Sequence, residues 1–77
     1  MTTYDELQRR YGDPARFVKG FKLRLAFARI TQLKFARECG FDYTQLNRWL
    51  SGRVMPSWES MLRLDDALDR MMNYEDH

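Results

Sequence analysis

The sequence has one cysteine, one histidine and no long apolar run. Cys39 has no second cysteine for an internal disulfide, and with the terminal His77 alone it makes a poor metal site. No stretch approaches the roughly 18 apolar residues that a membrane-spanning helix needs. The polar start MTTYDELQRR lacks the apolar segment of a signal peptide. These absences predict a reducing, cytoplasmic compartment and no metal or other cofactor.

The residue groupings of common enzymes are missing as well. We find no Ser/His/Asp or Cys/His arrangement and no phosphate-binding glycine loop, so neither an enzyme nor a small-molecule ligand is expected. The 77 residues leave no room for a second core and predict a single domain over 1–77. A core of this size contributes only a few kcal/mol of net stability, so tight packing or a homodimer is the expected support.

The charges are unevenly distributed although the net charge is only +2. Residues 16–53 carry nine Lys or Arg against two acids, whereas residues 54–77 carry two Arg against six acids. A basic middle beside an acidic end suggests a polyanionic partner. Chance clustering on a solvated surface is the alternative interpretation.

Apolar spacing and capping residues predict an all-α fold of about five helices without a strand. Gly12 and Gly40 are typical helix ends, and Gly20 inside a helix either costs stability or marks a close packing contact. The predicted helices cover 3–11, Pro14 to near Arg29, 32–38, 43–50 and 57–72. Their predicted N-caps are Thr3, Asp13, Thr31, Asp42 and Ser57.

Several apolar side chains are expected in the core from their helical spacing. Phe17, Phe21, Leu25 and Ala28 line one face of the second helix. The same reasoning places Phe35, Phe41, Leu46 and Trp49 in the core, whereas Trp58 fits either the core or a dimer contact.

Two short helices joined at Gly40 predict a helix-turn-helix over 31–52, with a recognition helix at about 42–50. Ala36 is small, as a close approach of the two helices requires. With Leu46 and Trp49 beneath, the polar side chains left on the outer side are Tyr43, Thr44, Asn47 and Arg48. The alternative is that these four form only the polar face of a surface helix.

From Phe21 to Leu68 the chain resembles the Xre/Cro/CI-like helix-turn-helix regulators of bacteria and phages. No single element is specific, but the elements together, in this order and register, make a fairly strong match. The resemblance rests on TQ at 31–32, FA at 35–36, CGF at 39–41, Leu46, Trp49, Gly52 and PSWESMLRLDDAL at 56–68. It implies a compact, lambda-repressor-like domain, here with an extra N-terminal helix.

The resemblance also implies roles for individual residues. It places Tyr43, Thr44 and Arg48 at base edges, and Asn47 has the chemistry to read adenine or bind phosphate. Gln32 would touch a phosphate and brace the first recognition residue. The remaining expected phosphate contacts are Lys34, Arg37, Ser51 and Arg53.

The sequence departs from this family at three points. Leu25 and Leu50 stand where the family commonly pairs an Arg with a Glu, and an apolar pair can replace a buried ion pair without loss. Asp65 stands where a small apolar residue is usual. The family's usual last helix is short or missing after Leu68, so its dimer surface cannot be carried over. The candidate dimer surfaces are Met71–Met72–Asn73–Tyr74 and the face formed by Tyr4, Leu7 and Tyr11.

These features predict a cytoplasmic, nucleoid-associated regulator that binds double-stranded DNA in a sequence-specific way. The favoured form is a repressor that binds a pseudo-palindromic operator as a homodimer, with its own gene as one candidate target. The main alternative is a protein-interaction module, such as an antitoxin or adaptor that keeps the fold. Non-specific architectural DNA binding is the third.

Overall fold

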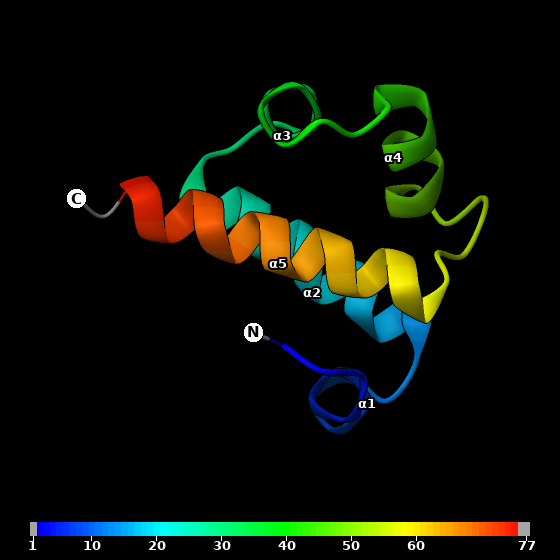
Figure 1. Cartoon of the computed structure of the whole chain (residues 1–77). Helices are drawn as coiled ribbons and strands as arrows, with labels where there is room; N and C mark the ends of the chain where they lie inside the picture. The colour runs from blue at the N-terminus through cyan, green and yellow to red at the C-terminus, as the bar shows by residue number, and fades with distance from the viewer. Residues whose placement is uncertain (1, 76–77) are drawn as a thin grey trace.

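The computed structural model describes the backbone of residues 2–75 and the side chains of residues 2–73. The described chain is all helical and compact, as predicted (Figure 1). Its five helices are α1 (Tyr4–Tyr11), α2 (Pro14–Ala28), α3 (Gln32–Cys39), α4 (Tyr43–Leu50) and α5 (Trp58–Glu75). The last helix is longer than the predicted 57–72. His77 lies outside the described residues.

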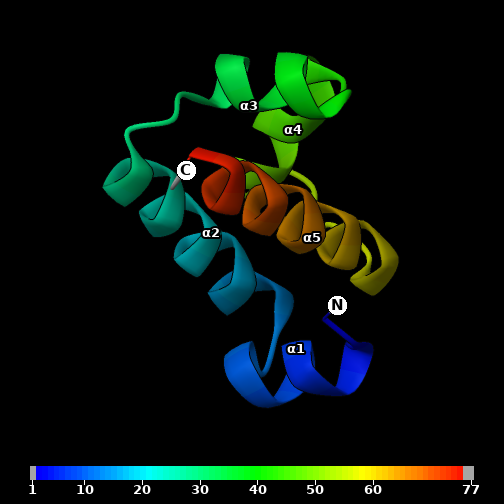
Figure 2. The same ribbon diagram turned by 60° about the vertical axis from the view of Figure 1, so that its left-hand side comes forward.

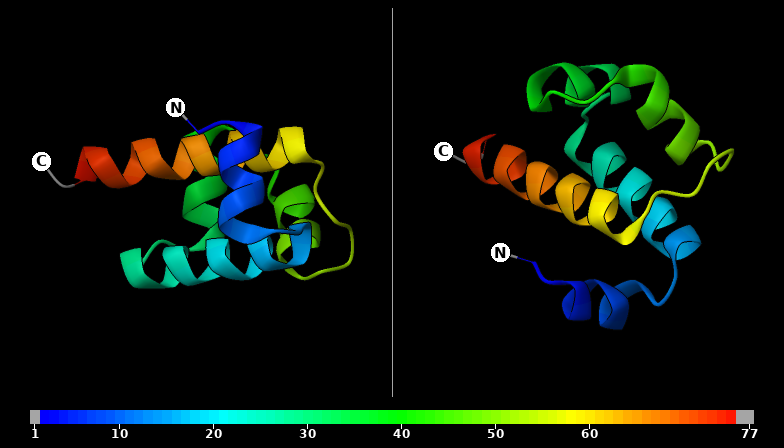
Figure 3. Two further views of the ribbon diagram at one scale, coloured as in Figure 1. Left: turned by 90° about the horizontal axis from the view of Figure 1, so that it is seen from below. Right: turned by 45° about the vertical axis from the view of Figure 1, so that its right-hand side comes forward.

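The helices form three layers. The two long helices, α2 and α5, lie side by side in the middle, with α1 on one side and α3 and α4 on the other (Figures 1 and 2). Seen from below, α1 crosses both long helices (Figure 3, left) and contacts each of them. This arrangement leaves α4 at the edge of the molecule, joined to α3 and α2 by packing contacts.

All five predicted N-caps are confirmed. Each capping side chain accepts a hydrogen bond from the amide three residues later, which satisfies one of the free N–H groups at a helix start. The capped amides are Glu6 (3.2 Å), Arg16 (2.9 Å), Lys34 (3.1 Å), Gln45 (2.9 Å) and Ser60 (3.1 Å). The helix starts therefore follow from local chemistry.

Helix α2 ends near Arg29 as predicted, but the conformation of Arg29 was not predicted. Arg29 closes the helix in the left-handed conformation at φ 57°, which non-glycine residues seldom adopt. Its amide donates to the Ala26 carbonyl at 3.1 Å, and the Ile30 amide donates to the Leu25 carbonyl at 2.9 Å. Ile30 is buried in the core. The burial of Ile30 thus holds Arg29 in a conformation that glycine usually supplies.

One apolar core connects all five helices. A chain of aromatic contacts runs through it: Tyr11, Phe17, Phe21, Phe35 and Phe41 follow one another at centroid separations of 5.1, 5.8, 5.3 and 5.5 Å. The rings alternate between edge-on and stacked contacts, both favourable geometries. The fully buried apolar side chains are Leu7, Phe17, Phe21, Phe35, Leu46, Met61, Leu64 and Leu68. Trp49, Trp58 and Phe41 are half-buried against this core.

The suggestion that Tyr4, Leu7 and Tyr11 form a dimer surface is wrong for Leu7 and weakened for Tyr11. Leu7 is fully buried inside its own chain, and Tyr11 packs edge-on against Phe17. Only Tyr4 remains substantially exposed. The N-terminal helix α1 therefore supplies part of the core of this small chain.

The second candidate dimer surface, Met71–Met72–Asn73–Tyr74, is weakened because Met71 and Met72 pack against the core. The side chain of Tyr74 lies outside the described residues.

Gly20 marks a close packing contact, which was one of the two interpretations of this glycine from the sequence. A Cβ added there would lie 2.8 Å from Cε1 of Tyr11. We expect Gly20→Ala to lower the free energy of unfolding by about 1–2 kcal/mol, because displacing the Tyr11 ring outweighs the roughly 1 kcal/mol that alanine adds to helix stability. Urea denaturation measures the change. In a Tyr11→Ala background the same substitution should stabilise; a wild-type-background variant more stable than the parent would contradict this packing.

None of the helices between residues 2 and 75 combines the length and apolar character needed to cross a membrane.

Candidate nucleic-acid interface

Helix α4 has one buried side and one exposed polar side. Leu46 and Leu50 are buried, and Trp49 packs half-buried beside them. The four predicted base-reading residues all lie on the opposite side and are exposed; Tyr43 retains 45 % of its accessible surface. Tyr43 and Asn47 form one row along the helix, and Thr44 and Arg48 form the next. Figure 1 and the right view of Figure 3 show that α4 lies at the edge of the molecule.

The connection between α3 and α4 is held rigidly. Gly40 closes α3 at φ 76° and ψ 27°, the left-handed conformation that its sequence position predicted. The next amide, Phe41, donates to the Ala36 carbonyl at 2.9 Å, and the Phe41 ring stacks on Phe35. The Arg63 guanidinium of α5 lies 5.3 Å from the centre of the Phe41 ring. These contacts fix the direction in which α4 leaves the turn.

Gln32 braces α4, but not at the predicted residue. The Asn47 side-chain amide donates to Oε1 of Gln32 at 3.3 Å, so the contact is with the second turn of α4 and not with its first residue. Gln32 is the first residue of α3, and the bond joins residues 15 positions apart. It positions Asn47 while leaving its amide oxygen and its second N–H able to bind other groups.

Three hydrogen bonds to the Arg48 carbonyl help to close the end of α4, besides the bonds that the Ser51 and Gly52 amides donate to Asn47 and Trp49. The backbone oxygen of Arg48 accepts from the Ser51 hydroxyl at 3.2 Å and from the amides of Arg53 and Val54 at 3.1 and 3.3 Å. Gly52 takes the left-handed conformation at φ 83°. The Ser51 and Arg53 side chains are both exposed on this ordered loop. The backbone beneath two predicted phosphate contacts is therefore well defined.

The other predicted phosphate contacts lie on α3. Lys34 and Arg37 are exposed, and Gln32 is partly exposed. Together with Arg48 and Arg53 they place four cations on α3, α4 and the loop that follows. The structure thus assembles all nine predicted site residues on two neighbouring helices and one loop.

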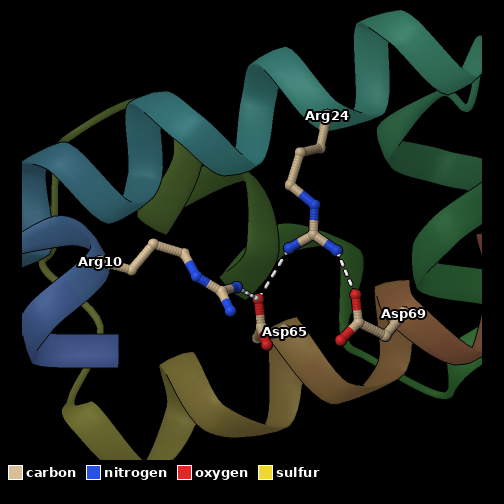
Figure 4. Close-up of polar contacts among 4 residues, drawn as sticks. All are labelled: Arg10, Arg24, Asp65 and Asp69. Carbon is tan, nitrogen blue, oxygen red and sulfur yellow. Dashed lines mark hydrogen bonds and ion pairs between the residues drawn. The ribbon is translucent and has the colours of Figure 1, made fainter. Parts of the chain in front are cut away.

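One cation of the basic middle is used elsewhere. Arg24 points from α2 towards α5, where its Nη1 donates to Oδ1 of Asp65 at 2.7 Å and its Nη2 donates to Asp69 (Figure 4). Arg10 of α1 reaches the same Asp65 oxygen at 3.9 Å. The nine cations of residues 16–53 that suggested a polyanionic partner include Arg24, but two aspartates neutralise Arg24 inside the molecule.

The ion pairs also explain why Asp65 replaces the expected small apolar residue. Its side chain is fully buried. Burial alone would lower the pKa of Arg24, but the hydrogen bond from Asp65 and the charges of Asp65 and Asp69 outweigh it, so that the Arg24 pKa is raised and the guanidinium stays charged. Oδ2 of Asp65 has no hydrogen-bond partner among the described residues. The i, i+4 spacing of Asp65 and Asp69 was the available signal, but nothing local pointed to Arg24.

Cys39 behaves as a small apolar residue. It is half-buried against the core at the end of α3. Burial, with a smaller contribution from Glu38, raises the pKa of its thiol, which keeps it protonated and weakly nucleophilic at neutral pH.

Comparisons with family models, curated proteins and solved structures found no match. The chemistry of the site therefore rests on its own residues. Leu25 and Leu50, for which the sequence resemblance predicted an apolar contact, are both buried in the shared core.

Proposed function

We propose that this protein binds double-stranded DNA sequence-specifically and that α3 and α4 form a helix-turn-helix, with α4 entering the major groove. One observation carries the proposal: α4 is anchored from beneath by Leu46 and Leu50 while its four outer polar side chains are uncovered. A major groove about 12 Å wide admits one α-helix presented in this way.

The outer side chains have complementary chemistry for base edges. Arg48 would donate two hydrogen bonds to O6 and N7 of guanine, and Asn47 would pair with N6 and N7 of adenine. The Thr44 methyl group would pack on a thymine methyl group, and Tyr43 would stack or donate its hydroxyl. The bond from Gln32 supports this role, since it reduces the freedom that Asn47 must lose on binding.

Phosphate contacts would orient the domain on the duplex. Gln32, Lys34 and Arg37 approach from α3, and Ser51 and Arg53 from the loop after α4. Such contacts supply affinity without sequence preference and make binding sensitive to salt.

The proposed biological role is a cytoplasmic repressor of the Xre/Cro/CI-like kind. A single α4 would touch only a few base pairs, so a homodimer on a pseudo-palindromic site is the expected binding form. The second candidate function is a protein-interaction module. The strong exposure of Phe27 on α2, away from the proposed reading helix, favours it.

Selection of bound sites from random double-stranded DNA tests the proposal. We expect one enriched motif with two half-sites about 10 base pairs apart, centre to centre, because a helix-turn-helix dimer places its two recognition helices one DNA turn apart. The affinity should fall steeply between about 50 and 200 mM salt, because several phosphate contacts release counterions. Arg9→Gln, on the opposite layer, should bind the motif as the parent does. The absence of an enriched motif, or binding insensitive to salt, would count against the proposal.

A further inference from the structure

Helix α2 exposes two large apolar side chains on one line. Leu23 keeps 53 % and Phe27 87 % of their accessible surface, and Phe27 is the most exposed large apolar residue of the described chain. At i and i+4 the two side chains lie one helical turn apart on the same face. We call this pair the α2 stripe. Uncovered apolar side chains that are grouped in this way mark interaction sites in soluble proteins.

The α2 stripe borders a groove. Between α2 and the end of α4 with its following loop lies a depression of about 360 Å³, with an apolar floor and two lysines among its lining residues. We call it the α2 groove. The lining residues that matter here are Val18, Leu23, Leu50 and Met55 for the floor, and Lys19 and Lys22. Leu23 belongs to both features, so stripe and groove form one continuous surface.

The charge of this surface selects its partner. Helix α2 contains no acidic residue. Lys19 and Lys22 are exposed, and neither forms an ion pair within the part of the chain that the structure describes. A complementary ligand therefore combines apolar side chains for the floor and stripe with carboxylates for the lysines.

Other occupants fit this combination less well. Two copies packed through α2 would bring two faces together whose only charges are positive. The DNA backbone has phosphates for the lysines but no aliphatic side chain for the groove floor. An anionic bilayer would cover the α2 stripe, yet a flat surface does not fill a depression.

We propose that the α2 stripe and the α2 groove together bind an acidic amphipathic helical segment of a partner protein. Apolar side chains at helical spacing would cover Leu23 and Phe27 and enter the groove, with carboxylates beside Lys19 and Lys22. This docking does not depend on DNA binding. It has a consequence for it, because Ser51 and Gly52 line the groove as well, and an acidic occupant there would repel DNA phosphates.

Selection from a random peptide library on the folded full-length chain tests the docking surface, without DNA. The enriched peptides should be acidic, with apolar residues three or four positions apart. One synthetic selected peptide is then measured by fluorescence anisotropy and mapped by amide shifts in NMR spectra. We expect Phe27→Ser and Lys22→Glu each to weaken its binding by at least about tenfold, as removal of a central anchor does.

The matched controls are Tyr4→Ser and Arg9→Glu on α1, which remove an exposed aromatic side chain and an exposed basic side chain from the opposite layer. Both should bind the peptide within about twofold, and all four variants should melt as the parent does, since these side chains are not buried. Enriched peptides without acidic residues, binding that Phe27→Ser leaves intact, or shifts confined to other helices would overturn the proposal. Two further results would overturn the proposal if no peptide binds at Phe27. One is that Phe27 mediates binding to phosphatidylserine vesicles in sedimentation experiments. The other is that sedimentation shows a dimer whose interface contains Phe27.

Competition with DNA is measured separately, on the enriched DNA site. The selected peptide should displace the DNA from the parent but not from Phe27→Ser. If no DNA site is found, the proposed function fails while the peptide measurements still decide the docking surface.

Discussion

Replacing Asp65 with alanine is expected to lower the free energy of unfolding by about 2–4 kcal/mol. The substitution removes the fully buried carboxylate to which Arg24 donates at 2.7 Å. Loss of one partner of a buried ion pair typically costs about 3–5 kcal/mol, because the other charge is left without compensation. Arg24 keeps Asp69 and its side chain is 23 % exposed, which reduces the cost. A domain with about 5 kcal/mol of total stability would be close to unfolding.

Urea denaturation of the parent and variants would measure this effect. The matched control is Arg70→Ala, which breaks an exposed i, i+4 pair with Asp66 and should change stability by less than about 0.5 kcal/mol. Replacing both partners, as in Arg24→Met with Asp65→Leu, should recover part of the loss, since the Arg24 charge is then no longer left without Asp65. An Asp65→Ala variant as stable as the parent would show that the pair does not hold α2 to α5.

Replacing Arg48 with alanine is expected to weaken binding to the selected DNA site by about 1–3 kcal/mol and to relax the preference at one base position. Arg48 is exposed on the outer side of α4 and forms no ion pair within residues 2–73. Its backbone oxygen still closes the helix end in the variant, because those bonds do not involve the side chain. The fold should therefore be unchanged and the loss confined to base recognition.

Repeating the DNA selection with the variant measures the relaxed position directly. Arg53→Ala is the comparison, since a phosphate contact should lower the affinity for all sequences alike and reduce the salt slope by about one. The two substitutions remove the same charge, and Arg53 follows the helix that carries Arg48. A uniform loss for Arg48→Ala, without a relaxed position, would refute its base-reading role.

Local features of the fold were predictable because their causes lie within a few residues. Thr31 and Asp42 cap the amides three positions later, and Gly40 takes the left-handed conformation that ends α3. The two sides of α4 followed from the spacing of Leu46, Trp49 and Leu50. The nine proposed DNA contacts were also chosen from sequence, and the structure leaves them accessible on α3, α4 and the loop after α4.

Features that depend on distant partners were not predictable. Leu7 looked like half of a dimer surface because a short helix with three apolar positions does not reveal what covers it. Arg24 looked like one more surface cation because its partner Asp65 lies 41 residues away in the sequence. The exposure of Leu23 and Phe27 was not predicted, because it depends on which face of α2 the other helices cover.

The sequence by itself determined where each helix begins and which side of α4 is apolar, because capping bonds and helical periodicity act over three or four residues. Only the tertiary structure decided which charges are neutralised and which apolar side chains remain uncovered. Both outcomes depend on contacts between α1, α2 and α5, whose residues meet only after the chain has folded.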